Sequence, residues 1–245
     1  RASLLSGAGR VYAACLSNGA PSVDMLYPEL MFRKPADLTN LAQLDSVVIG
    51  PGLGQSQAAI ELLEFWLSQN VVMLIDADGL NLIAKHPYLA AICKNRRAET
   101  LITPHAGEAA RLLGVGSEAI QQNRIDSALK LASELHATCV LKGADSVVAH
   151  YDGNYLVNTS GNVGLASGGT GDVLSGIIGS LLAQNVSALE AAKLGVYVHG
   201  AAADALVARG VGPVGLTASE VSIEARNIIN QLSQLNQSLA KPAKQ

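Results

Sequence analysis

The chain has 245 residues, of which 49% are hydrophobic and 15% charged, and its formal net charge is −3. An average soluble domain carries about 25% charged residues, and a disordered chain needs high charge with few apolar residues, so this composition excludes disorder. The near-neutral balance supplies no broad basic surface and argues against nucleic acid as a partner.

The cysteines and the apolar runs indicate the compartment. Cys15, Cys93 and Cys139 are widely spaced and odd in number, which is typical of a reducing compartment and not of a disulfide framework or a cysteine zinc site. The longest apolar runs have the length of a strand, so we expect no membrane span. The sequence therefore predicts a soluble, cytoplasmic protein.

The first residues predict the end of a helix at 1–6, a glycine stop at 7–9 and a strand at 10–15. A chain that begins inside a helix is expected to lack an upstream strand and loop of the intact protein. No signal or transit segment is visible in the sequence.

Short β-branched runs then alternate with longer amphipathic stretches. The strands are expected at 45–49, 71–75, 101–103, 138–141, 146–149 and 154–157, and the helices at 56–69, just after 79, at 119–136 and over much of the chain beyond 165, including 194–208. Alternation of this kind predicts one α/β domain over residues 1–245, with a mainly parallel sheet covered by helices on both faces. We expect the polar tail at 235–245 to be frayed.

Three local signals refine this picture. Ser187 with Glu190 and Thr217 with Glu220 have the spacing of a capping box at a helix start. Trp66 lies between apolar neighbours in a helix and is expected in the core or at a subunit interface.

The segment Asn158–Gly176 is the densest chemical signal, because it places a glycine loop directly before an apolar helix that begins near Gly169. Backbone N–H groups and the positive helix end make Gly168, Gly169, Thr170 and Gly171 a candidate anion hole. Asp172 would repel a phosphate there, unless it accepts the proton of a hydroxyl that attacks the phosphate. The structural alternative is an ordinary aspartate in the first turn of a helix.

Competing phosphate-binding motifs are absent from the sequence. No Gly-Lys-Ser/Thr follows the glycines, as a Walker A loop requires, and the glycine runs at 52–57 and 169–174 lack the third glycine of a dinucleotide fingerprint. The sequence therefore predicts phosphate chemistry without a P-loop.

Together with Ile49–Gly54, Asp76–Asn81, Thr103–Glu108 and Leu141–Ala144, the glycine segment resembles the ADP-dependent NAD(P)H-hydrate dehydratases of the ribokinase-like superfamily. The match runs in order from about Gly7 to Val221. It implies a three-layer α/β/α fold. Members of the family often carry an N-terminal epimerase domain, so a fused or separate epimerase is an expected partner, and related proteins are homotetramers.

The resemblance implies a repair reaction on the S-form of NADH hydrate or NADPH hydrate. ADP, with Mg²⁺, phosphorylates the hydroxyl of the hydrate, and departure of phosphate restores NAD(P)H alongside AMP. No residue distinguishes ADP from ATP as the donor. Two alternatives stay open: a ribokinase-like kinase for a pyrimidine, thiazole or pyridoxal alcohol, and a nucleotide-binding module without turnover.

The resemblance also implies roles for single residues. Asp172 matches the general base and a substrate contact, Gly54 and His105 match positions against the hydrated nicotinamide, and Gly171 touches the nucleotide. The nucleotide is also expected at Lys142, Gly143, Ala144, Asp145 and Ser146, where the family usually has threonine in place of serine.

Two interpretations of Glu108 stay open, one as a metal-binding residue and one as a structural residue. Sugar kinases of the superfamily use a glutamate here to order Mg²⁺ through water, but His105 replaces their asparagine. Glu108 is also explained as an acid at a helix start. The remaining histidines, His86, His136, His150 and His199, are expected to be structural.

Overall fold

The computed structural model describes residues 1–17, 19–41 and 43–240. The helices are α1 (Ala2–Leu5), α2 (Pro35–Thr39), α3 (Gln57–Ser68), α4 (Ala77–Lys85), α5 (Pro87–Lys94), α6 (Ala106–Leu113), α7 (Ser117–Gln122), α8 (Arg124–Leu135), α9 (Thr170–Ala183), α10 (Ala188–Ala208) and α11 (Ala218–Ala240), with a 3₁₀ turn at Val163–Ala166. The strands are β1 (Tyr12–Ala14), β2 (Met31–Arg33), β3 (Val47–Ile49), β4 (Met73–Ile75), β5 (Thr100–Ile102), β6 (Thr138–Leu141), β7 (Ser146–Ala149) and β8 (Tyr155–Asn158).

The central sheet has six strands in the order β3-β4-β5-β6-β7-β8. The first four are parallel, while β7 and β8 continue the sheet as an antiparallel hairpin. This confirms the mainly parallel sheet, and it places the carboxyl ends of β3 to β6 at one edge, where α/β folds bind their ligands. The strands β1 and β2 form a separate parallel pair.

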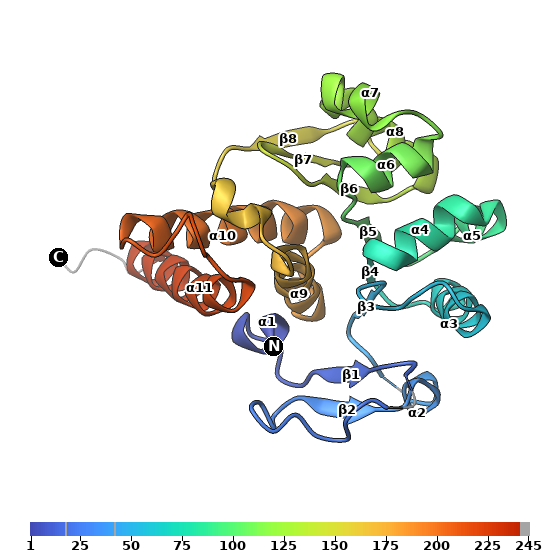
Figure 1. Cartoon of the computed structure of the whole chain (residues 1–245), viewed down its shortest axis with the longest axis horizontal. Helices are drawn as coiled ribbons and strands as arrows, with labels where there is room; N and C mark the ends of the chain where they lie inside the picture. Colours follow the sequence, from blue (N-terminus) through green and yellow to red (C-terminus); the bar gives the residue numbers. More distant parts are fainter. Residues whose placement is uncertain (18, 42, 241–245) are drawn as a thin grey trace.

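Helices cover both faces of the sheet, which makes three layers (Figure 1). Alternate residues of the strands divide between two cores: Ile75 and Ile102 pack with α3 to α8, whereas Leu74 and Leu101 pack with α9, α10 and α11. Strands buried on both faces are the reason why the sequence shows continuous apolar runs here. Trp66 is 8% exposed and belongs to the first core, as predicted.

Three predicted helical features differ. The helix expected just after 79 begins earlier, at Ala77, because Asp76 is its N-terminal cap. The helix expected at 119–136 is two helices, because Asn123 leaves helical backbone angles between α7 and α8. Ser187 makes no side-chain cap at α10; the carboxylate of Glu99 instead accepts from the amide of Ala188 at 3.2 Å. The second capping box is confirmed, since Thr217 and Glu220 exchange hydrogen bonds.

The C-terminal helix α11 continues to Ala240, so it covers the first part of the segment expected to be frayed. Residues 241–245 lie outside the described residues. Within the described ranges, no helix combines the length and apolarity needed to cross a membrane.

Candidate active site

The glycine segment enters α9 with a backbone suited to anions. Gly169 is the residue before the helix and has φ +85°, a left-handed conformation that favours glycine. The amide of Val173 donates to the Gly169 carbonyl, so the amides just before Val173 have no partner in the helix ladder. The 14-residue α9 also directs its positive end here. Free backbone amides and a positive helix end thus meet at 168–171, and binding of an anion there stays a prediction.

Hydrogen bonds of two side chains, Thr170 and Asp204, hold this loop in place. The hydroxyl of Thr170 donates to carbonyls of Leu165 and Ser167, so the donor that Thr170 can offer an anion is its backbone amide. Asp204 on α10 accepts from the amide of Gly161 at 2.8 Å and from the Asn162 side chain at 2.9 Å. The loop is thus held by the second core layer, through residues that the sequence did not single out.

Lys142 lies at the centre of a network of charged side chains that includes Asp76 and Glu108. It lies at the end of β6 beside His105 at the end of β5, and its Nζ is 2.7 Å from Asp76 Oδ1 and 3.9 Å from Glu108 Oε2. A Cβ placed on Gly171 would lie 3.5 Å from the same Nζ. Lys142 therefore links the glycine loop to the ends of β4 and β5.

Asp76 is the buried anchor of the network, with 1% exposure. It caps α4 by accepting from the amide of Ala77, and its second oxygen accepts from the hydroxyl of Ser175 at 2.7 Å. A buried carboxylate needs such partners. Neither Asp76 nor Ser175 was predicted as a site residue. Ser175 follows Asp172 by three residues and so lies on the same side of α9.

Asp172 stands in the first turn of α9 at the exposed edge of this network. Partial burial of the carboxyl raises its pKa, the charge of Asp76 raises it further, and the charge of Lys142 lowers it. A carboxylate with a raised pKa beside an anion hole is suited to accept a proton from a reacting hydroxyl.

His105 and Glu108 lie together at the start of α6. The Glu108 carboxylate, 4% exposed, accepts from the amide of His105 at 2.8 Å, and the imidazole Nδ1 accepts from the amide of Gly107 at 2.9 Å. These hydrogen bonds agree with the structural interpretation of Glu108 as an acid at a helix start. The imidazole Nε2 lies 3.4 Å from Glu108 Oε1, and the side chain is 54% exposed.

The Gly50–Gly54 turn borders the same edge. The amide of Gly54 donates to Asp78 Oδ2 on α4 at 2.9 Å. A Cβ on Gly50 would overlap the backbone carbonyl of Asp76, so this glycine allows the turn to lie against the strand end that carries the buried carboxylate. Helix α4 thereby holds the turn in place.

The predicted nucleotide segment 142–146 is the turn from β6 into β7. The hydroxyl of Ser146 donates to the carbonyl of Gly143 at 3.1 Å, which stabilises the turn itself. Gly143 has φ +159°, and a Cβ there would lie 2.8 Å from the guanidinium of Arg124, which caps the carbonyl of Leu141. All the predicted site residues thus lie on segments that meet at one edge of the sheet.

His199 on α10 is a further polar group that the sequence left as structural. It hydrogen-bonds the backbone of Thr170, and burial lowers its pKa to about 4. Its Nε2 is buried without a hydrogen-bond partner in the part of the chain that the structure describes. It lies behind the anion hole, in the second core layer.

Comparisons with known proteins give relatives over nearly the whole chain. The sequence model of a family described as NAD(P)H-hydrate dehydratase matches residues 1–225. An ADP-dependent (S)-NAD(P)H-hydrate dehydratase of Neisseria meningitidis is 39% identical over 95% of this chain and 79% of its own length. A bifunctional NAD(P)H-hydrate repair enzyme of Escherichia coli is 42% identical over 94% of this chain, which spans only 44% of that relative.

Solved structures give the same picture for the fold. An ADP/ATP-dependent NAD(P)H-hydrate dehydratase of Bacillus subtilis, co-crystallised with ATP and Mg²⁺, has a TM-score of 0.80 and 27% identity, covering 94% of this chain and 84% of its own. A ribokinase-like superfamily protein of Enterococcus faecalis has a TM-score of 0.78 and 28% identity, covering 94% and 80%. The three-layer fold is ribokinase-like, as the resemblance implied.

Proposed function

The chain belongs to the NAD(P)H-hydrate dehydratase family, and we propose from this premise that it uses ADP to dehydrate the S-form of NADH hydrate and NADPH hydrate. The observation that supports this most directly is the position of Asp172. Its carboxylate stands beside an anion hole formed by backbone amides and across from Lys142.

The reaction begins with attack of the hydrate's hydroxyl oxygen on the β-phosphorus of ADP. Asp172 accepts the hydroxyl proton, and the bond to the departing AMP breaks. The amides of residues 168–171 hold the transferring phosphoryl group, and Lys142 offsets its charge. The new phosphate ester then leaves as phosphate, pushed by the ring nitrogen, and loss of the C5 proton restores the 5,6 double bond.

Gly54 and His105 are proposed to contact the hydrated nicotinamide, and the turn at 142–146 the nucleotide. The Gly54 turn is fixed by Asp78, and the His105 imidazole is oriented by the amide of Gly107. Both are therefore ordered before a substrate arrives, which lowers the cost of positioning it.

Mg²⁺, when bound, would neutralise the phosphates of the nucleotide. The donor set fits a hydrated ion better than a directly ligated one, because Glu108 Oε2 already accepts from the amide of His105 and both Asp76 oxygens are occupied. Glu108 would therefore hold the ion through water. A homotetramer, a cytoplasmic location and an epimerase partner stay predictions.

The test is the appearance of reduced-nicotinamide absorbance when the protein is mixed with NADH hydrate and Mg²⁺, with ADP, with ATP or with no nucleotide. A rise that requires ADP or ATP, with release of AMP and phosphate or ADP and phosphate, supports the proposal. Accumulation of a stable phosphorylated product would indicate a kinase instead.

The role of Asp172 is tested with Asp172→Asn. We expect turnover to be lost while ADP still binds, because the amide removes the base and leaves the anion hole intact. Full turnover in this variant would contradict the proposed base.

A further inference from the structure

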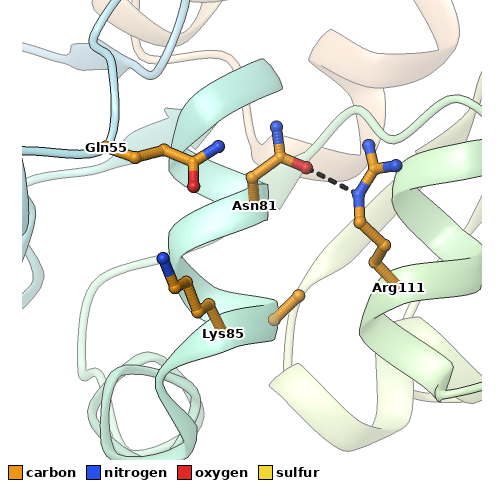
Figure 2. A pocket seen from close by; sticks show the side chains of 5 residues that line it. Gln55, Asn81, Lys85 and Arg111 are labelled. Atoms are coloured by element: carbon orange, nitrogen blue, oxygen red, sulfur yellow. Dashed lines mark hydrogen bonds between the residues drawn. The ribbon is translucent and has the colours of Figure 1, made fainter.

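A pocket of about 590 Å³ lies beside the proposed reaction site and has no role in the chemistry described above (Figure 2). It is lined by Gln55, Asn81, Ala84, Lys85 and Arg111. Its volume lies within the range of small-molecule sites. Four of the five lining residues have polar or charged side chains, and the two charged ones are both cationic.

The pocket shares its walls with the segments that are proposed to bind the nicotinamide. Gln55 directly follows Gly54, whose amide is held by Asp78 one turn before Asn81 on α4. Arg111 lies on α6, the helix that His105 caps. A Cβ on Gly107 would be 2.9 Å from His105 Cε1 and 3.8 Å from Arg111 Nη1, so imidazole and guanidinium flank the same residue.

The pocket contains two positive charges that are not neutralised by a carboxylate of the described residues. Arg111 donates from Nε to Asn81 Oδ1 at 2.8 Å, a neutral partner that orients the guanidinium and leaves its charge unpaired. Across the described residues, no carboxylate lies within ion-pair distance of Lys85 or Arg111. Asp78, on the same face of α4, is turned to Gly54 instead.

A guanidinium fixed by one hydrogen bond can still bind two oxygens of a phosphate, and the lysine adds a second charge. Gln55 and Asn81 add side-chain amides to the same pocket lining (Figure 2). The nicotinamide hydrate is attached through one ribose to a pyrophosphate with two negative charges. The nucleotide phosphates are already assigned to the separate amides of residues 168–171, so they do not need these cations.

We propose that this pocket is the subsite for the pyrophosphate of the dinucleotide substrate, which Lys85 and Arg111 bind with the help of Gln55 and Asn81. This inference rests on the proposed function. The subsite makes the enzyme select a complete dinucleotide over a bare nicotinamide nucleoside. It binds substrate and takes no part in bond breaking.

The experiment measures KM and kcat for Lys85→Ala and Arg111→Gln with NADH hydrate, NADPH hydrate and the phosphate-free hydrate of dihydronicotinamide riboside. Because a charged hydrogen bond is worth more than about 1.4 kcal/mol, which is a tenfold factor in affinity, we expect KM for both dinucleotides to rise about tenfold or more. The KM for ADP and the activity on the riboside should stay unchanged.

Lys94→Ala is the matched control, because it removes one exposed lysine from the neighbouring α5 with the same change in net charge. Lys85 is exposed and forms no ion pair within the described ranges, so we expect its variant to keep the stability of the wild type. Binding of NADH itself, followed by its fluorescence, tests the pocket even if the wild-type protein shows no turnover. Absent turnover in the wild type would count against the proposed function alone.

Four outcomes would overturn the subsite. These are an unchanged KM for the dinucleotides, a rise in the KM for ADP instead, a rise confined to NADPH hydrate, which would point to its 2′-phosphate, and an equal effect of Lys94→Ala.

Discussion

His199 makes the stability of the fold depend on pH in a way that can be calculated. Its imidazole is 9% exposed. Burial is the main cause that lowers its pKa from 6.5 to about 4, and the charge of Lys142 adds to this, while the hydrogen bond with Thr170 opposes it. The folded protein thus keeps the neutral form, whereas the unfolded chain takes up a proton near pH 6.5.

The direction in which the free energy of unfolding changes with pH follows from proton linkage. Below pH 6.5 the unfolded state binds more protons, so the stabilisation is complete above that pH and is lost as pH falls toward 4. Between pH 8 and pH 5, a shift from 6.5 to about 4 lowers the free energy of unfolding by about 2 kcal/mol.

The assay compares the wild type with His199→Asn by urea unfolding at pH 8 and pH 5, followed by circular dichroism. At pH 8, the difference in the free energy of unfolding between the two proteins measures how much the substitution disturbs packing. The loss between the two pH values should be about 2 kcal/mol smaller in the variant, because asparagine does not titrate. An equal loss in both proteins would refute the assignment of a buried neutral histidine.

Five further predictions concern the site and the thiols. Lys142→Met should lower the free energy of unfolding by about 3 kcal/mol, because Asp76 would stay buried without its cation; urea unfolding measures this, and adding Asp76→Asn should recover part of it. Gly52→Ala, at φ +62° with open space around it, should cost about 1 kcal/mol in thermal unfolding. Gly50→Ala should cost several times more and weaken ADP binding, since its Cβ would displace the Asp76 carbonyl. In a pH profile of kcat/KM, which reports the free enzyme, activity should fall as pH falls through the raised pKa of Asp172, and so at a higher pH than for an ordinary aspartate. Iodoacetamide should label Cys15 alone in the native protein and all three cysteines in denaturant, because Cys93 and Cys139 are buried and burial raises the pKa of Cys93 to about 12.

Most of the fold could be predicted because each central strand is buried on both faces and shows as an apolar run. The strands predicted at 138–141 and 146–149 have the same bounds in the structure. The strand at 31–33 was missed, because three residues between Pro28 and Pro35 are too few to show a periodicity. The break at Asn123 depends on one residue's backbone angles, which a periodic pattern over 119–136 cannot show.

The candidate site was predictable where its signal is local. Glycines before a helix and a following aspartate are visible in a short window, and so are strand-end residues such as Lys142 and His105. Ser175 and His199 act through partners on other elements, so their roles appear only when α9 packs against β4 and α10. The same applies to Asp204, which fixes the loop from 42 or more residues away.

The contacts of Asp76 join parts of the chain that are far apart in sequence: its partner Lys142 is 66 residues away and Ser175 is 99 residues away. Closing such long loops is costly in entropy, and the contacts form only after both halves of the domain have docked. A ligand that bridges the glycine loop and Lys142 therefore binds only the assembled molecule. At a concentration 100-fold above its Kd, it would add about 2.7 kcal/mol to global stability. Resistance to proteolysis in the presence of nucleotide would thus report assembly of the entire domain, including regions that the nucleotide never touches.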